Sequence, residues 1–192
     1  EGYSTIELQY NGTSVVDIFS NTSSNIFIGL DSGSVITSGT GNIALGDNAL
    51  SANTVGTSNT AIGHFALDSN VAKQGSTAIG YQAMMYADST TTQGLSYNTA
   101  VGYQALVGSA TASANTGMYN TAVGHQSMTV NTSGSYNSAL GVNTLISNTI
   151  GQYNVAIGYA ALFTNVAKDA SVAIGYEAMR YADNTVTSST SG

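Results

Sequence analysis

The stretch NTAVGYQAL, from Asn98 to Leu106, returns as NTAVGHQSM, from Asn120 to Met128. Both follow a nine-residue motif that starts with Asn and has Ala, an aliphatic residue and Gly at positions 3, 4 and 5. The motif starts at Asn25, Asn42, Asn59, Ser76, Asn98, Asn120, Asn137, Asn154 and Ser171. Successive starts are 17 residues apart, except for intervals of 22 after Ser76 and Asn98. Fixed periods of this size indicate a solenoid, in which each repeat buries its apolar face by stacking on its neighbours.

A longer period contains the short one. NVAKQGSTAIGYQAMMYAD, which starts at Asn70, returns 95 residues later as NVAKDASVAIGYEAMRYAD, which starts at Asn165. Five short repeats therefore make one long repeat. The thirteen-residue linker after the ninth motif ends at Gly192, one residue before a tenth motif would start. We expect either that another molecule continues the stack there or that Gly192 is a fragment boundary.

The motif itself predicts a short strand. It combines β-branched Thr, Val and Ile with Tyr, and Gly, Asn, Ser and Thr flank it. Each period then forms one turn of a parallel β-coil, with successive turns about 4.8 Å apart. Residues 25–192 are therefore predicted to be an all-β repeat domain, a parallel β-solenoid of nine turns.

Three columns of the motif predict how each turn is built. Position 4 is aliphatic throughout, at Ile28, Leu45, Ile62, Ile79, Val101, Val123, Leu140, Ile157 and Ile174. Position 9 is apolar in eight copies, at Leu50, Leu67, Met84, Leu106, Met128, Leu145, Leu162 and Met179. Position 5 is always Gly, at Gly29, Gly46, Gly63, Gly80, Gly102, Gly124, Gly141, Gly158 and Gly175. Positions 4 and 9 face opposite sides of an uninterrupted strand, so we expect a glycine hinge that brings both columns into one core.

Two further columns allow two interpretations each. Position 3 is Ala in every copy but one, where Phe27 stands. Such a small side chain either permits close approach of another wall or chain, or fills a narrow coil. Position 1 is Asn in seven copies, and stacked Asn side chains can form a hydrogen-bonded ladder along a rod. Asn can equally serve each turn by itself as a turn-forming residue.

The composition excludes several functional classes. Charged residues make up 7% of the chain and its net charge is −7, with Lys73, Lys168 and Arg180 as the basic residues. Nucleic acid is therefore not an expected partner. The sequence has no apolar run long enough to cross a membrane, so no insertion is expected. Leu, Ile, Val and Phe form about a fifth of the chain, too little to cover one thin coil, and we expect oligomerisation along the rod.

The repeats also resemble those of a known family. NTAIGHFAL, STAIGYQAM, NTAVGYQAL and SVAIGYEAM are similar to head repeats of YadA-type trimeric autotransporter adhesins and to related repeats of phage and viral fibres. The resemblance covers residues 25–192. It implies a left-handed parallel β-roll in which three identical chains wind side by side. The repeats are longer than is common in the family, so larger loops are expected on one side of the roll.

Residues 1–24 lie outside the repeat. Ile6, Leu8 and Tyr10 alternate with polar residues, and Asn11-Gly12 separates them from a second apolar run, which predicts a β-hairpin. A solenoid needs its open end covered, because exposed edges recruit other strands. The hairpin is thus expected to cap the roll or to join one molecule to the end of the next in a head-to-tail filament.

Candidate sites for chemistry are few. Sequons at Asn11, Asn21 and Asn131 are candidate glycosylation sites. Position 6 carries a candidate surface aromatic row that could stack on sugars or pack on the flank of the rod, formed by His64, Tyr81, Tyr103, His125, Tyr159 and Tyr176. The two histidines are three turns apart, so they cannot share a site in one chain, although three copies of one His around a threefold axis could bind a metal ion. Carboxylate pairs do not recur in register, and we expect neither catalysis nor a cofactor.

These features predict an extracellular structural or adhesive fibre subunit that assembles by stacking homotrimeric β-rolls. Its expected partners are copies of itself and a cell-surface glycan or matrix. The expected location is extracellular, on a cell surface or on a virion. Two alternatives are a receptor-binding segment of a phage or viral tail fibre, and an ice-binding solenoid suggested by the column Thr60, Thr77, Thr99 and Thr121.

Overall fold

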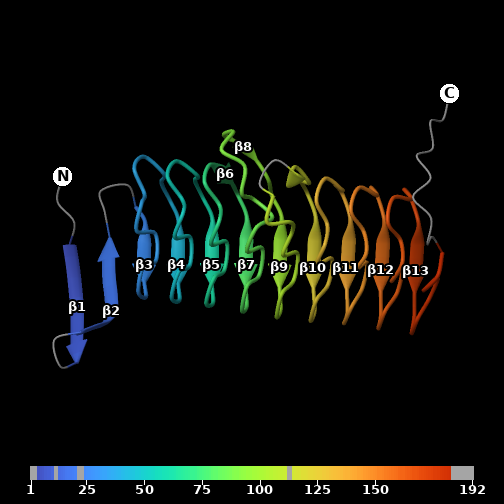
Figure 1. The fold of residues 1–192 in the computed structure, drawn as a ribbon, viewed down its shortest axis with the longest axis horizontal. Coiled ribbons are helices and arrows are strands. Elements are labelled where there is room, and N and C mark those ends of the chain that lie inside the picture. The colour runs from blue at the N-terminus through green and yellow to red at the C-terminus, as the bar shows by residue number, and fades with distance from the viewer. Residues whose placement is uncertain (1–3, 11–12, 21–23, 112–113, 183–192) are drawn as a thin grey trace.

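The protein is an all-β solenoid, shown in Figure 1 by a computed structural model that describes residues 4–10, 13–20, 24–111 and 114–182. Each turn, here called a rung, begins at position 1 of a motif, and the rungs are numbered 1 to 9 from Asn25 to Ser171. Every rung contains one three-residue strand at motif positions 2 to 4. These strands are β3 (Ile26–Ile28), β4 (Ile43–Leu45), β5 (Thr60–Ile62), β7 (Thr77–Ile79), β9 (Thr99–Val101), β10 (Thr121–Val123), β11 (Ser138–Leu140), β12 (Val155–Ile157) and β13 (Val172–Ile174).

The nine strands form one parallel sheet that runs the length of the rod. Neighbouring strands pair without any slip, so that Ala78 lies beside Ala100 and Ala100 beside Ala122. The pairing stays in register across the two 22-residue rungs as it does across the 17-residue rungs. The extra residues of rungs 4 and 5 therefore leave the sheet undisturbed, which confirms the predicted parallel β-solenoid.

Hydrogen bonding between rungs continues beyond the strands and around a corner. In rung 5 the Gly102 N–H donates to Ile79 O at 2.8 Å, Gln104 N–H donates to Tyr81 O at 2.9 Å, and Leu106 N–H donates to Ser127 O at 2.9 Å. Positions 7 and 9 achieve this with positive φ, as in Gln104 (φ 53°) and Leu106 (φ 51°). A non-glycine residue in the left-handed region costs about 1–2 kcal/mol, so this corner requires the support of its neighbours.

The glycine hinge at position 5 is confirmed. Its φ lies between 119° and 138° in all nine rungs, a region that residues with a Cβ rarely adopt. A Cβ added to Gly102 would lie 2.5 Å from the carbonyl oxygen of Gly124, and the same close approach recurs from Gly29 to Gly158. Both the backbone angle and the spacing of the rungs therefore require glycine.

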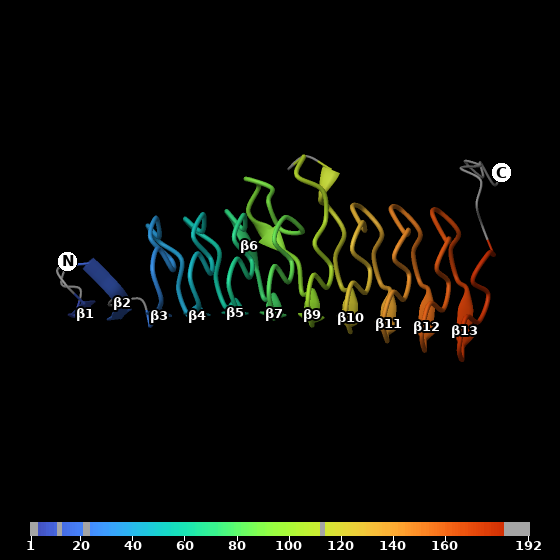
Figure 2. The same cartoon turned by 60° about the horizontal axis from the view of Figure 1, so that its bottom comes forward.

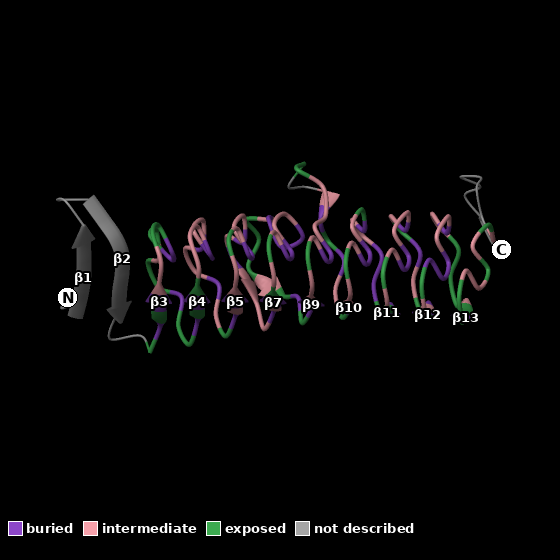
Figure 3. Ribbon diagram, turned by 90° about the horizontal axis from the view of Figure 1, so that it is seen from below, coloured by how far each residue is buried: buried purple, intermediate pink, exposed green. Residues whose placement is uncertain are grey.

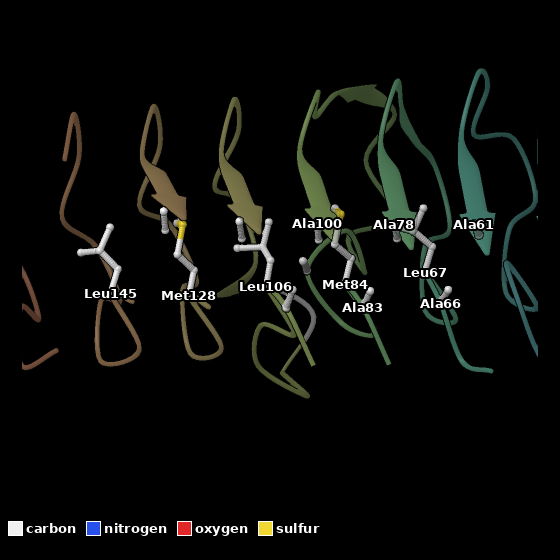
Figure 4. Packing of buried hydrophobic residues seen from close by; sticks show 14 of the residues in the cluster. Ala61, Ala66, Leu67, Ala78, Ala83, Met84, Ala100, Leu106, Met128 and Leu145 are labelled. Carbon is white, nitrogen blue, oxygen red and sulfur yellow. The ribbon is translucent and has the colours of Figure 1, made fainter. Parts of the chain in front are cut away.

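The core lies between the sheet and the opposite wall of each rung, and it is built from positions 3, 8 and 9 (Figures 3 and 4). The position-3 alanines are buried within a single chain, which confirms the interpretation that Ala fills a narrow coil. Position 9 is fully buried from Leu50 to Leu162, as predicted. Met179 is the exception and is exposed, because no described rung stacks beyond it.

The prediction that position 4 forms part of the core is wrong. Ile28, Ile62, Val101 and Val123 are only half-buried, and Leu45, Ile79, Leu140, Ile157 and Ile174 are exposed. Side chains alternate along a strand, and the inward directions belong to positions 1 and 3. The hinge turns position 9 inward to meet Ala at position 3, and position 4 stays on the outer surface of the sheet.

The first rung keeps the same core volume by exchanging large and small residues. Phe27 replaces Ala at position 3 and is fully buried, while Gly33 replaces Leu or Met at position 9. A Cβ on Gly33 would lie 2.4 Å from the Phe27 ring, so the ring occupies the space that a position-9 side chain fills in other rungs.

The longer linkers of rungs 4 and 5 project from the rod beyond the row of ordinary turns (Figures 1 and 2). Strand β8 (Gly94–Leu95) in the long linker of rung 4 pairs in parallel with β6 (Lys73–Gln74) in the linker of rung 3, and the two form a separate two-stranded sheet. The prediction that larger loops lie on one side of the roll fits this arrangement.

The N-terminal hairpin covers the first rung. Strands β1 (Ser4–Tyr10) and β2 (Thr13–Ser20) pair antiparallel, and β2 pairs antiparallel with β3, placing Phe19 beside Phe27. The predicted hairpin is therefore confirmed, and it extends the sheet at this end. A role as a joint between molecules stays a prediction.

Replacing Gly102 by Ala is expected to destabilise the rod by about 2–4 kcal/mol, from backbone strain and the clash with Gly124. The matched control is Gly41→Ala, because Gly41 also has a positive φ but its added Cβ would meet nothing closer than 3.7 Å. Thermal and urea unfolding of the two variants measures the difference. Equal midpoints would show that close rung contact is not what requires glycine at position 102.

The exchange in the first rung predicts a rescue. Phe27→Ala should cost about 3–5 kcal/mol by leaving a cavity, and Gly33→Leu should cost about 1–3 kcal/mol by overpacking. The double variant recreates the Ala–Leu pair of rung 2, where Leu50 has a φ of 53° close to the 56° of Gly33. We expect it to recover most of the lost stability in a double-mutant cycle of unfolding free energies. Additive losses would contradict the proposed exchange of volume.

Candidate functional site

The outer surface of the sheet is the most extensive functional candidate. Motif positions 2 and 4 point outward from every strand, so each rung adds two side chains to one continuous surface. Rungs 1, 2, 8 and 9 contribute two aliphatic residues each, and rungs 3 to 6 contribute a Thr and an aliphatic residue. Aliphatic side chains of this size, exposed or half-buried in register along a whole rod, are unusual on a free protein surface.

The predicted aromatic row at position 6 borders the outer surface of the sheet. The structure places its side chains on the exterior of the protein. Tyr81 stacks on Tyr103 with ring centroids 5.2 Å apart, and Tyr103 stacks on His125 at 5.1 Å. His64 approaches Tyr81 edge-on at 5.8 Å, and Tyr159 stacks on Tyr176 at 5.3 Å. Val142 occupies the same column between His125 and Tyr159. We call this column the corner ladder.

A second aromatic column borders the other side of the surface. It consists of the residues that directly precede four consecutive motifs: Tyr97, Tyr119, Tyr136 and Tyr153. Their rings are exposed and stack with centroids 5.6, 5.0 and 5.0 Å apart in chain order. Sequence reasoning missed this tyrosine ladder, although four Tyr-Asn pairs in successive repeats were a visible signal.

The stacking geometry bears on the idea that the corner ladder stacks on sugars. Tyr81 and Tyr103 are inclined by only 15°, and Tyr103 and His125 by 8°, so these rings cover one another's faces. A sugar that stacks on an aromatic ring needs an open face. The rings instead present their edges and hydroxyl groups outward, so the geometry favours flank packing over sugar stacking.

The interior holds an asparagine ladder along rungs 1 to 3 and 5 to 8, one of the two interpretations of position 1. The Oδ1 of Asn120 accepts the Asn137 N–H at 3.1 Å, and Asn120 Nδ2 donates to Gly134 O at 2.8 Å. Asn137 repeats both contacts: its Oδ1 accepts the Asn154 N–H of the next rung, and its Nδ2 donates to Gly151 O of its own rung. The position-1 asparagines are almost completely buried, and each accepts one backbone N–H of the following rung and donates to one carbonyl oxygen of its own rung.

Ser76 interrupts this ladder, and the carboxylate of Asp88 occupies the gap. Asp88 is buried and accepts hydrogen bonds from Ser76 Oγ at 2.5 Å, Ser96 Oγ at 2.6 Å and Asn98 Nδ2 at 3.4 Å. Burial raises the pKa of Asp88, while these three hydrogen bonds and the positive charge of Lys73 act in the opposite direction. The sequence pairs Ser171 with Asp183 at the same spacing of 12 residues, although Asp183 lies outside the described residues.

A second column of buried asparagines corrects one predicted modification site. Asn131 is buried, donates to Gly134 O at 2.9 Å, and accepts from Asn148 Nδ2 at 2.8 Å. A glycan on this amide would have to pass through the core, so the prediction of Asn131 as a glycosylation site is wrong. The other two sequons, Asn11 and Asn21, lie outside the described residues.

The histidines lie on separate rungs of the corner ladder. His64 Nε2 is 3.4 Å from Asp47 Oδ2, and both side chains are well exposed. His125 stacks on Tyr103. Within the described ranges, no group of three His, Cys, Asp or Glu residues is placed to bind a metal ion, and no helix could span a membrane.

Comparisons of the chain with protein-family models, curated proteins and solved structures find no significant match.

The buried carboxylate predicts a specific pH dependence. Because its pKa is raised in the folded protein, folding gains stability as the pH falls from that raised value toward the ordinary 3.8, and gains nothing further below it. Asp88→Asn keeps the shape without the charge, so we expect a higher unfolding midpoint at pH 7 and loss of this stabilisation on acidification. Urea unfolding at several pH values checks both expectations.

The control for the other carboxylates is Asp31→Asn, because Asp31 is exposed. It should retain the wild-type change of stability with pH. A pH profile of Asp88→Asn that matches the wild type would contradict the assignment of the carboxylate to the buried ladder.

Proposed function

We propose that the protein is a subunit of an extracellular structural or adhesive fibre, and that three copies associate side by side through the outer surface of the sheet. The observation that carries this proposal is the apolar outer surface, bordered by the corner ladder and the tyrosine ladder. The resemblance of the repeats to trimeric adhesin heads supports the same arrangement. The proposed role is mechanical and adhesive, without catalysis.

The size of the surface suits a stable interface. Nine rungs spaced about 4.8 Å apart make it about 38 Å long, and the six residues from one ladder to the other span at most about 20 Å. The area is therefore at most roughly 750 Å², which approaches the roughly 800 Å² that each partner buries in a typical specific complex. Among positions 2, 4 and 6 and the residues directly before each motif, Asp47 is the one Asp, Glu, Lys or Arg, so association requires little desolvation of charge.

A second copy of the chain is the partner that this surface fits best. Its side chains repeat every rung, and another rod with the same rung spacing offers the same repeat. Parallel rods around a common axis keep rungs of similar composition level with one another along the whole length. Cyclic association of identical chains is also the commonest route to a soluble oligomer.

Substitution of the outer surface tests the proposal. The paired change Leu140→Asp and Ile157→Asp places two charges on the surface, and we expect it to convert the oligomer into a monomer with unchanged circular dichroism. Light scattering coupled to size exclusion measures the number of chains. The matched control is Ile150→Asp, because Ile150 is 48% exposed, similar to Leu140 at 51%, but lies in a linker away from the sheet.

A monomeric wild-type protein at tens of micromolar would overturn the proposal, as would an oligomer that survives the paired change. Electron microscopy of the wild type separates the fibre from the tail-fibre alternative, since long continuous filaments favour the former and discrete short rods the latter.

A further inference from the structure

We infer that, in the side-by-side assembly, the tyrosine ladder of each chain packs against the corner ladder of its neighbour and forms an aromatic joint along rungs 5 to 8. This inference rests on the proposed association of chains through the outer surface. It adds which residues meet at the joints between chains, and it assigns a role to the tyrosine ladder.

The pairing follows from symmetry and from the order of residues along each strand. The tyrosine ladder precedes the strand and the corner ladder follows it, so the two ladders border opposite sides of the outer surface. When parallel rods turn these surfaces toward a common axis, rotation brings the start of one strand beside the end of the neighbouring strand. Every such joint is therefore heterologous, with a tyrosine ladder on one side and a corner ladder on the other.

The composition along the rod confines the aromatic joint to rungs 5 to 8. In these rungs the residue before the motif is always Tyr, and position 6 is Tyr103, His125, Val142 or Tyr159. In rungs 1 to 4 the residue before the motif is Ser24, Gly41, Ser58 or Gly75, so that side of the joint has almost no side chain. Each joint is thus aromatic along rungs 5 to 8. Along rungs 1 to 4 it is narrow, because one of its two sides carries only Gly or Ser.

The ring geometry suits contacts at the ring edges. Tyr136 and Tyr153 stack with planes inclined by 5°, so their faces are covered within the chain while their edges and hydroxyl groups remain free to contact a neighbour. Tyr and His combine an apolar ring with a polar atom, which suits a boundary between a buried interface and water. The first ring of the ladder, Tyr97, extends over Gly75, where an added Cβ would lie 2.4 Å from the ring. The transition from the narrow to the aromatic half of the joint therefore occurs between rungs 4 and 5.

Photo-oxidative coupling of tyrosines tests the joint directly. Ruthenium tris-bipyridyl, light and persulfate remove one electron and one proton from each of two adjacent phenols, which then join through a carbon–carbon bond. Coupling within one ladder leaves the mass of the chain on a denaturing gel unchanged, whereas coupling across a joint produces covalent dimers and trimers. We expect both products from the wild-type oligomer, with Tyr97–Tyr103 or Tyr153–Tyr159 links in the peptide mass spectra.

The variant is the fourfold change Tyr97→Phe, Tyr119→Phe, Tyr136→Phe and Tyr153→Phe, which keeps the rings and removes the hydroxyl groups needed for coupling. It should remain an oligomer by light scattering, and its yield of covalent dimers and trimers should fall at least tenfold. The control changes Tyr86 and Tyr181, which lie outside both ladders, to Phe and should couple as the wild type does.

The outcomes distinguish the two proposals. An oligomer that yields no covalent product, or a fourfold variant that couples as well as the wild type, overturns the aromatic joint and leaves the side-by-side fibre standing. A wild-type protein that is monomeric by light scattering overturns the fibre proposal and the joint with it.

Discussion

Contact between successive glycines at position 5 sets the geometry of the rod. Each glycine turns the chain at the end of a strand, and its neighbour's carbonyl oxygen occupies the place of a side chain, as between Gly102 and Gly124. Because both residues lack a Cβ, the corners can stack as closely as the strands do. Hydrogen bonds from rung to rung then continue through the left-handed residues that follow, and the strain of those residues is spread along a cooperative ladder.

A coil held this tightly has little interior, and its contents follow from that limit. Ala at position 3 and Leu or Met at position 9 fill the apolar half, and the first rung reverses the two sizes with Phe27 and Gly33. The polar half is filled by asparagines, each of which has a carbonyl oxygen for an N–H of the next rung and an amide group for a carbonyl oxygen of its own rung. Where Ser76 is too short for this role, Asp88 completes the network at the cost of burying a carboxylate.

The sequence was sufficient to predict the solenoid, its nine rungs, the glycine hinge and the hairpin, because each depends on spacing and local conformation. It was not sufficient to assign the faces of the strand. Position 4 is uniformly aliphatic, and a column such as Ile79, Val101 and Val123 appears the same whether it lies inside one chain or against another. The useful signal was the parity shared by Asn98 and Ala100, because both positions point into the narrow interior, where Ala fits and Asn forms the buried ladder. The tyrosine ladder was missed because it lies just before the motif.

The mistaken assignment of position 4 has a physical basis that links the fold to the proposed assembly. A narrow coil cannot enclose a row of Ile, Val and Leu side chains in addition to position 9, so these residues must lie outside. In the proposed oligomer they form a second core, shared between chains, and burying them contributes about 25 cal/mol for each Å² removed from water. That contribution exists only while the chains are associated, so folding and association become linked equilibria. A single chain has its hydrogen bonds and its narrow core, and in the proposed oligomer neighbouring chains supply the apolar burial that one coil is too thin to provide.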